Sequence, residues 1–308
     1  MAAVMGMQGG LLNDPRWLAA GAGGLVSAIA VMWAVRGLPV GFAAFWLAPF
    51  PIFAAGLSSG PAAALGALAV AAALLWFLAN IYGLLIYLAV FGVPAVAMVV
   101  VAFRAGALDA GRSLAFLGVW PAAMVLLAAF LAAGEPGGLE GVLRRTTEAT
   151  LSRIGMSASE IAQTDIVRVK AAAIAFWFTL ALAINGAWAQ GFLAKRGWSL
   201  APSPAWTEAR MPIWYAAMPL IAAGGWLLAP AGADTVPLSV LLVTLLPVFL
   251  AGLAAVHRLS RGRPGRPVLL TGFYLGLILL SLPAMAAVTG FGIYDQWGRR
   301  NAPPGGKT

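Results

Sequence analysis

The most constraining feature of this sequence is a run of 67 residues, 37–103, that contains no Asp, Glu, Lys or Arg. A helix needs about 20 apolar residues to cross the hydrocarbon of a bilayer, so this run is long enough for three crossings. Of the 308 residues, 62% are hydrophobic and only 9% are charged, against about 25% charged in a soluble domain. So few polar side chains could not cover the surface of a soluble fold. The sequence therefore predicts an all-α, polytopic membrane protein.

Charge-free stretches divide the chain into nine expected transmembrane helices, with eight as the alternative. The alternative arises if residues 40–57 are re-entrant, because Pro39, Pro49 and Pro51 free backbone carbonyls that neighbours or water must satisfy. The expected spans are residues 17–35, 40–57, 61–79, 81–103, 113–133, 171–193, 212–229, 236–256 and 267–293.

A polar segment, residues 134–170, separates the fifth and sixth expected spans. Leu139, Leu143 and Leu151 recur at helical spacing among charged residues, which predicts an amphipathic helix in the membrane interface. A solvated loop and a lid over a pocket are the alternatives. Ser157 and Glu160 form a capping-box pattern that would begin a second helix leading into the sixth span.

The charge distribution predicts orientation. The formal net charge of +9 lies mainly in short loops between apolar spans, which indicates topology and contact with the lipid bilayer, especially anionic lipid, rather than nucleic acid. The basic cluster at residues 257–266 places that loop and the N-terminus in the cytoplasm and the C-terminus outside. The N-terminus shows no cleavable signal pattern, so the first span acts as its own insertion signal. Abundant Ala, Gly and Arg is typical of a GC-rich bacterial gene, so we expect the bacterial inner membrane.

Several kinds of chemistry have no matching residues. The chain has no Cys and a single His, His257, which excludes thiolate sites and any site with two imidazoles. There is no HExxH, GxSxG or phosphate-binding GK[ST] pattern. None of the ten acidic residues lies in the middle of an expected span, which argues against a proton- or sodium-coupled carboxylate relay. We expect no catalytic residues, no metal and no cofactor.

Neutral polar and aromatic residues inside the spans are therefore the candidates for a ligand site. Asn185 lies mid-span in the sixth helix, and Gln190 follows about one and a half turns later. An Asn in a dry bundle must find a partner, so interhelical hydrogen bonding is the alternative to ligand contact. Trp46 and Trp226 also lie deep in their spans, where bundle packing is the alternative. The candidate ligand-binding residues are Asn80, Tyr82, Trp177, Asn185, Trp188 and Gln190.

The tail GFGIYDQWGRRN, residues 290–301, brings charge back after 28 uncharged residues. Asp295, Trp297 and Arg299 are interpreted as a structural anchor where the last helix leaves the membrane, because aromatic and Arg side chains suit headgroup depth. The alternative is that Asp295 or Arg299 folds back to lock the end of another helix. The loop arginines are expected to contact lipid or a protein partner; they are Arg258, Arg261, Arg263 and Arg266.

Two stretches resemble a known family. Residues 49–66, PFPIFAAGLSSGPAAALG, resemble the junction of the second and third helices in the S-components of energy-coupling-factor transporters. The tail GFGIYDQWGRRN is similar to that of the YybS-like family of bacterial membrane proteins, which is itself distantly S-component-like. The resemblance implies an S-component-like membrane unit at residues 17–193, further helices at 194–293, and polar tails at 1–16 and 294–308.

Function follows from that resemblance as an expectation. S-components bind a small molecule and rely on a separate energising module, so the leading hypothesis is a non-enzymatic module that binds or transports a small solute. The alternative is a structural or assembly scaffold for other membrane proteins, and an intramembrane enzyme comes third. An enclosed polar cavity at Asn185 and Gln190 would favour binding. Side chains fully used by neighbouring helices would favour the scaffold.

Overall fold

The computed structural model describes residues 14–104, 106–153, 155, 166–230 and 233–301 of the chain. Nearly all of them are helical; among them the strands are only β1 (Phe103–Arg104) and β2 (Ala107–Leu108), a two-residue antiparallel pair. The Ser157–Glu160 capping box lies outside the described residues. The prediction of an all-α, multi-pass membrane protein is confirmed.

Eight helical segments of the described chain are long and apolar enough to cross a membrane, one fewer than the nine expected. The missing ninth is not residues 40–57, which form most of a candidate span. It is residues 212–229, where the apolar helix covers only Ile213–Leu227, about 22 Å of axis against about 30 Å of hydrocarbon. The eight are Pro15–Val35, Gly41–Ser59, Pro61–Leu78, Ile81–Ala102, Ala110–Leu131, Val167–Ala194, Thr235–Leu259 and Arg266–Arg300.

Contacts divide the chain into two compact units. Unit 1 comprises Met1–Asp109 and Trp177–Pro204, and unit 2 comprises Ala110–Phe176 and Ala205–Thr308. The residues of one helix, α10 (Ile166–Ala194), fall in both units.

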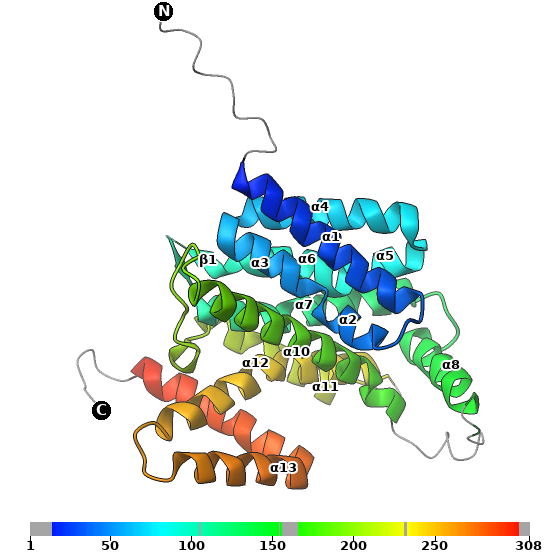
Figure 1. The fold of residues 1–308 in the computed structure, drawn as a ribbon. Coiled ribbons are helices and arrows are strands. Elements are labelled where there is room, and N and C mark those ends of the chain that lie inside the picture. Colours follow the sequence, from blue (N-terminus) through cyan, green and yellow to red (C-terminus); the bar gives the residue numbers. More distant parts are fainter. Residues whose placement is uncertain (1–13, 105, 154, 156–165, 231–232, 302–308) are drawn as a thin grey trace, which may run out of the picture. The chain divides into compact units, whose positions relative to one another are not determined.

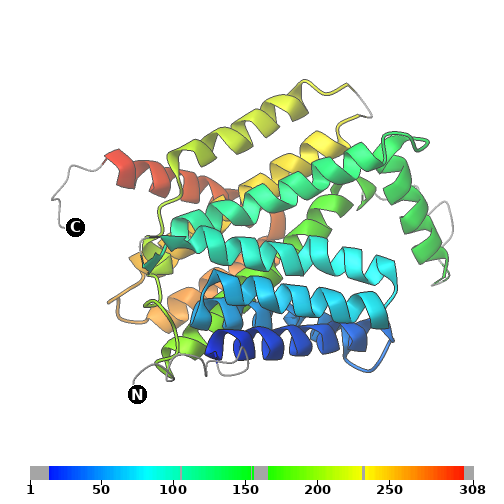
Figure 2. The same cartoon turned by 90° about the horizontal axis from the view of Figure 1, so that it is seen from above.

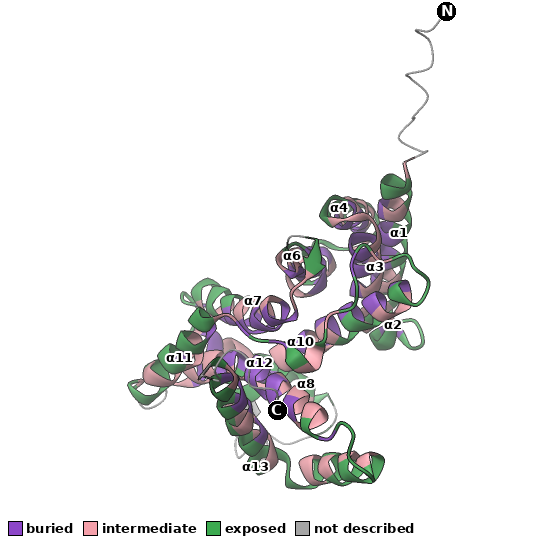
Figure 3. Ribbon diagram, turned by 90° about the vertical axis from the view of Figure 1, so that its left-hand side faces the viewer, coloured by how far each residue is buried: buried purple, intermediate pink, exposed green. Residues whose placement is uncertain are grey.

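Unit 1 is built around three closely packed helices, α1 (Pro15–Val35), α3 (Pro49–Ser59) and α4 (Pro61–Leu78). Small residues allow this close approach: a Cβ atom at Gly23 would come within 2.9 Å of the Pro51 carbonyl oxygen, as expected where membrane helices pack backbone to backbone. The inner faces are buried and the outer faces exposed (Figure 3). The unit also contains α2 (Gly41–Leu47), α5 (Ile81–Tyr87), the π-helix η2 (Leu88–Gly92), α6 (Val93–Ala102) and the part of α10 from Trp177 onward.

The helices of unit 1 begin at sequence signals. Asp14 accepts a hydrogen bond from the Arg16 backbone N–H at 2.9 Å, and Pro15 occupies the first helical position of α1, the arrangement expected at an N-terminus. Pro61 begins α4 in the same way, directly after Gly60, whose φ of 96° favours glycine. These caps fix the residues at which α1 and α4 begin.

Unit 2 contains α7 (Ala110–Leu131), α8 (Gly138–Ser152), the 3-10 turns η3 (Trp206–Glu208) and η4 (Ile213–Ala216), α11 (Ala217–Leu227), α12 (Thr235–Leu259) and α13 (Arg266–Asn301). α7 packs closely on α12, and the Tyr215 hydroxyl donates to the Thr244 carbonyl at 2.8 Å. Together these contacts build the buried interior of the unit around α12.

The predicted amphipathic helix in the polar segment is present as α8, which leaves the end of α7 at a steep angle (Figure 2). Leu139 is buried, as the helical spacing predicted. Glu140 accepts a hydrogen bond from Thr235 at 2.7 Å, and Lys170 donates to Thr147 at 2.8 Å. Polar contacts therefore tie α8 to α12 and α10; its position relative to a membrane stays a prediction.

α13 folds back on itself. Ser281 has φ 43° and ψ −110°, so two helical arms meet there, and Figure 1 shows them as an orange arm and a red arm. At 1.5 Å per residue, the arms measure about 22 and 30 Å. Phe273 of the first arm and Val288 of the second both pack with α12, in a cluster that includes Phe249. α13 is thus a helical hairpin laid against α12.

This hairpin changes the expected path of the C-terminal chain. The sequence placed the loop at residues 257–266 and the tail on opposite sides of the membrane. In the structure the guanidinium of Arg258, beside that loop, pairs with the carboxylate of Asp295 in the second arm. The prediction of one straight span over residues 267–293 was wrong, because the reversal at Ser281 returns the chain toward the end it left. The side of the membrane on which the C-terminus lies stays a prediction.

Cysteine labelling checks this arrangement. The chain has no cysteine, so Arg263→Cys and Asn301→Cys each give a single reactive thiol. We expect a membrane-impermeant maleimide to reach both thiols from the same side of the membrane, and neither from the other side until the cells are permeabilised. Labelling from opposite sides would show that α13 crosses the bilayer once.

Candidate functional site

The six predicted ligand-binding residues all lie in unit 1 or at its boundary, but they do not form one site. Asn80 caps α5, where its Oδ1 accepts from the Gly83 backbone N–H at 2.7 Å. Tyr82 is 75% exposed and Trp177 is 56% exposed. An exposed aromatic on a membrane helix faces lipid or headgroups. The structure therefore places these three residues in capping and surface positions.

Two more candidates have their polar groups or rings engaged by neighbours. The Gln190 side chain donates to the Ala201 carbonyl at 2.9 Å and accepts from Ser199 at 3.0 Å. These bonds fasten the segment after α10 to the helix. Trp188 lies against Phe50, with ring centroids 5.1 Å apart. Gln190 and Trp188 thus hold the local structure together.

Asn185 is different, because it is fully buried with 0% of its surface exposed. Its Nδ2 donates to the Trp46 carbonyl at 2.9 Å and to the Ala181 carbonyl at 2.8 Å. Turning the amide over would set Oδ1 against both carbonyls, so the hydrogen bonds fix its orientation. Oδ1 then has no partner among the described residues.

The Trp46 carbonyl lies beside an interruption between α2 and α3. α2 ends at Leu47, Ala48 follows and α3 begins at Pro49. Pro49 and Pro51 lack N–H groups, so two carbonyls of α2 lose their helical donors. Counted four residues back, these are the carbonyls of Phe45 and Leu47. The Trp46 carbonyl lies between them and accepts a hydrogen bond from Asn185.

A second buried pair serves the same interruption. Ser27 donates to the Ala48 carbonyl at 2.8 Å, and its hydroxyl oxygen lies 2.7 Å from the Tyr87 hydroxyl. Ser27 and Tyr87 are both fully buried. The π-helix η2 begins directly after Tyr87, and single π-turns inside helices are frequent at functional sites.

These five residues define the helix-interruption cluster: Ser27, Trp46, Ala48, Tyr87 and Asn185. Within it, the buried indole Nε1 of Trp46 and the buried Oδ1 of Asn185 have no hydrogen-bond partner in the described structure. A buried polar atom without a partner costs about 1–3 kcal/mol. The cluster therefore holds one unused donor and one unused acceptor in an uncharged setting.

The predicted anchor residues form a different site, in unit 2. The Asp295 carboxylate, with 7% of its side chain exposed, pairs with Arg258 and with Arg299, the latter at 2.9 Å. Arg299 also donates to the Ala209 carbonyl at 2.9 Å. Asp295 and Arg299 thus hold the second arm of α13 to α12 and to the segment before η4, whereas Trp297 is exposed.

Further arginines surround this ion pair. Arg261 donates to Thr207 at 2.6 Å and lies 3.6 Å from Glu208, while Arg300 donates to the Met211 carbonyl at 2.8 Å. Seven arginines and two carboxylates gather here, a formal excess of five positive charges. This basic face consists of Arg210, Arg258, Arg261, Arg263, Arg266, Arg299, Arg300, Glu208 and Asp295.

The described residues contain no group of three His, Cys, Asp or Glu side chains that could hold a metal ion. Comparisons with protein families, curated proteins and solved structures found no match. The geometry of the two sites is thus the basis for a functional proposal.

Sequence reasoning missed Ser27 and Tyr87, and it missed that Trp46 and Asn185 meet. The closely spaced Pro49 and Pro51 marked the interruption, but the donors that they remove belong to the carbonyls of Phe45 and Leu47 and not to those of Trp46 or Ala48. Nothing in the local sequence of Ser27 or Tyr87 shows which partner each would find.

Proposed function

We propose that the protein is a non-enzymatic module of the bacterial inner membrane that binds a small polar solute at the helix-interruption cluster. The observation that carries the proposal is the unused pair, the Trp46 Nε1 donor and the Asn185 Oδ1 acceptor, buried beside an interrupted helix. Membrane transporters commonly build substrate sites from discontinuous helices. The resemblance to S-components favours the same function.

The chemistry of the cluster selects the kind of solute. Its side chains are an indole, an amide, an aliphatic hydroxyl and a phenol, so none carries a formal charge. The unused Trp46 N–H can donate to an acceptor on the ligand, and the unused Asn185 oxygen can accept from a donor on it. The solute should therefore be uncharged and small, with an acceptor for the Trp46 indole N–H and a donor for the Asn185 amide oxygen.

Native mass spectrometry of the detergent-purified protein tests this proposal. We expect a reproducible small-molecule adduct on the wild type. Trp46→Phe keeps an aromatic ring but removes the N–H donor, and Asn185→Leu removes the acceptor together with the Nδ2 donor. Each should weaken retention about tenfold, the effect of one hydrogen bond. The matched control is Trp188→Phe, which changes an exposed indole of the same unit and should retain the adduct.

The outcomes separate the proposal from its competitor. Absence of any small-molecule adduct, or equal retention in Trp46→Phe, Asn185→Leu and the wild type, would contradict solute binding. The second candidate is an assembly scaffold, which the exposed arginines of the basic face favour because they suit acidic partners. Its signature is a stoichiometric co-purified protein that is lost in Arg261→Gln and Arg263→Gln.

A further inference from the structure

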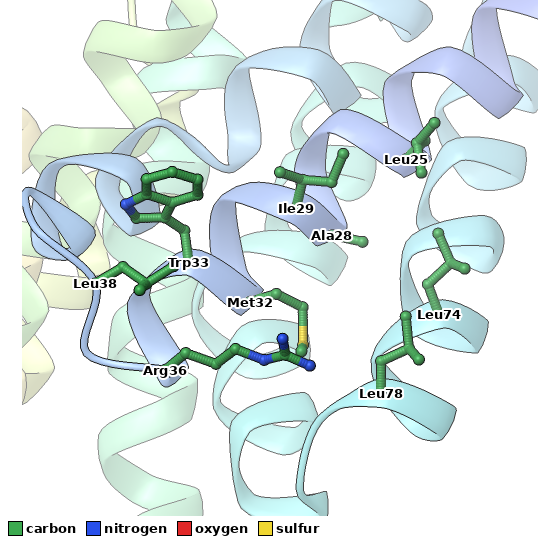
Figure 4. Close-up of a pocket in the computed structure, with 9 residues that line it drawn as sticks. All are labelled: Leu25, Ala28, Ile29, Met32, Trp33, Arg36, Leu38, Leu74 and Leu78. Carbon is green, nitrogen blue, oxygen red and sulfur yellow. The ribbon is translucent and has the colours of Figure 1, made fainter.

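A separate apolar groove lies in unit 1 between α1 and α4 and beside the turn that follows α1 (Figure 4). Its volume is about 340 Å³, within the range of roughly 300–1,000 Å³ typical of ligand sites. Its lining consists of Leu25, Ala28, Ile29, Met32, Trp33, Arg36, Leu38, Leu74 and Leu78. All of these residues except Arg36 are apolar or aromatic.

The length of the groove matches one leaflet of a bilayer. Leu25 and Arg36 stand at its two ends (Figure 4), eleven residues apart on one helix and its cap, or about 16 Å along the axis. Half of the roughly 30 Å hydrocarbon core is about 15 Å. An acyl chain entering beside Arg36 would therefore reach about as far as Leu25.

Arg36 gives the groove a polar end. It follows the last residue of α1, is exposed, and forms no ion pair or side-chain hydrogen bond with another described residue. Figure 4 shows its guanidinium beside Met32. A guanidinium binds phosphate oxygens in a bidentate manner, so this end suits an anionic headgroup.

The turn that carries Arg36 is held in place by Trp33. The indole Nε1 of Trp33 donates to the Pro39 carbonyl at 2.8 Å, and the Leu38 backbone N–H donates to the Trp33 carbonyl at 3.2 Å. Trp is the residue that favours the headgroup depth of a membrane. The polar end of the groove is thus preformed beside a residue type that favours headgroup depth.

We propose that this groove binds one anionic phospholipid, with an acyl chain along α1 and α4 and the phosphate on Arg36. Charge and shape together select this occupant. A free phosphate would leave the apolar wall from Leu25 to Leu78 unused, and an uncharged lipid would leave the Arg36 guanidinium without a counterion. The site is independent of the solute proposed for the helix-interruption cluster.

Lipid titration followed by native mass spectrometry tests the inference, with phosphatidylglycerol as the anionic probe and phosphatidylcholine as the zwitterionic one. We expect the wild type to bind one phosphatidylglycerol more tightly than phosphatidylcholine. Arg36→Gln should weaken phosphatidylglycerol binding about fivefold, the effect of one Arg beside an anionic surface, and weaken phosphatidylcholine binding less, because the choline cation offsets the phosphate charge. Ile29→Trp, which fills the groove, should weaken both.

Two control variants on the same helix make the result specific. Arg16→Gln removes a charge at the other end of α1, and Leu18→Trp enlarges an exposed residue outside the groove. Both should bind like the wild type. Equal affinity of the wild type for the two lipids, or an Arg36→Gln variant that keeps the wild-type preference, would overturn the inference.

Discussion

Replacing Asp295 by Asn is expected to lower the free energy of unfolding by about 3 kcal/mol. The carboxylate is nearly buried and pairs with Arg258 and Arg299, whose side chains are 23% and 19% exposed. Removing one partner of a buried pair costs about 3–5 kcal/mol, because the remaining charge stays desolvated and uncompensated. Partial exposure of the arginines favours the lower end. A denaturant titration in detergent micelles measures the change.

The control for this prediction is the exposed pair of the same face. Glu208 has 62% of its side chain exposed and lies 3.6 Å from Arg261. Glu208→Gln should change stability by less than about 1 kcal/mol, as is typical of surface pairs. A second variant, Asp295→Asn with Arg258→Met, should recover part of the loss because it removes an unpaired charge. Equal effects of Asp295→Asn and Glu208→Gln would contradict the buried-pair interpretation.

The second large effect is expected at Gly292, where the second arm of α13 crosses α12. A Cβ atom there would overlap the backbone carbonyl of Val248, and one at Gly252 would overlap the carbonyl of Val288. A backbone carbonyl in a helix cannot relieve the overlap by changing rotamer, as a side chain can. Gly292→Ala should therefore destabilise the protein by about 1–3 kcal/mol, the usual cost of overpacking, measured by the same titration.

The same helix offers a matched variant, because nothing lies within 4 Å of a Cβ atom built at Gly290. Gly290→Ala should stabilise the protein by about 0.5–1 kcal/mol, since Ala loses less backbone freedom in a helix. The two substitutions are chemically identical and two residues apart, so opposite signs would identify the close contact. Destabilisation by both would instead indicate that the arm needs its glycines for flexibility.

The membrane class and most of the spans were predictable, because charge and apolar length are properties of local sequence. The hairpin of α13 was not. Pro283 signals a kink, but a reversal needs Ser281 in a backbone conformation that Ser seldom adopts. Packing of both arms on α12 stabilises this backbone conformation of Ser281. The prediction of a span over residues 212–229 was wrong although their composition suits one. In the structure this segment forms a 3-10 turn and an α-helix of only 11 residues.

Individual residues of the candidate sites were predictable from the sequence, but the contacts between them were not. Asn185 was chosen because an amide in a dry bundle needs a partner, yet that partner, Trp46, lies 139 residues away. Likewise, Asp295 was considered as a possible lock, but its contact with Arg258 spans 37 residues. A single sequence shows which side chains need a partner, and tertiary packing decides which partner each one finds.

The hairpin of α13 has a consequence for how the membrane part is assembled. The guanidinium groups of Arg258 and Arg299 meet at the Asp295 carboxylate. The charged side chains of the tail therefore lie at the end of α12 and need not pass through the hydrocarbon. Each Arg at the centre of a membrane helix costs about 2.5–3.5 kcal/mol on insertion, and each charge moved across a potential of 100 mV involves about 2.3 kcal/mol more. With Arg299 and Arg300 remaining on the side of Arg258, residues 266–301 can enter the bilayer as a loop, tip first, without translocating a single charge.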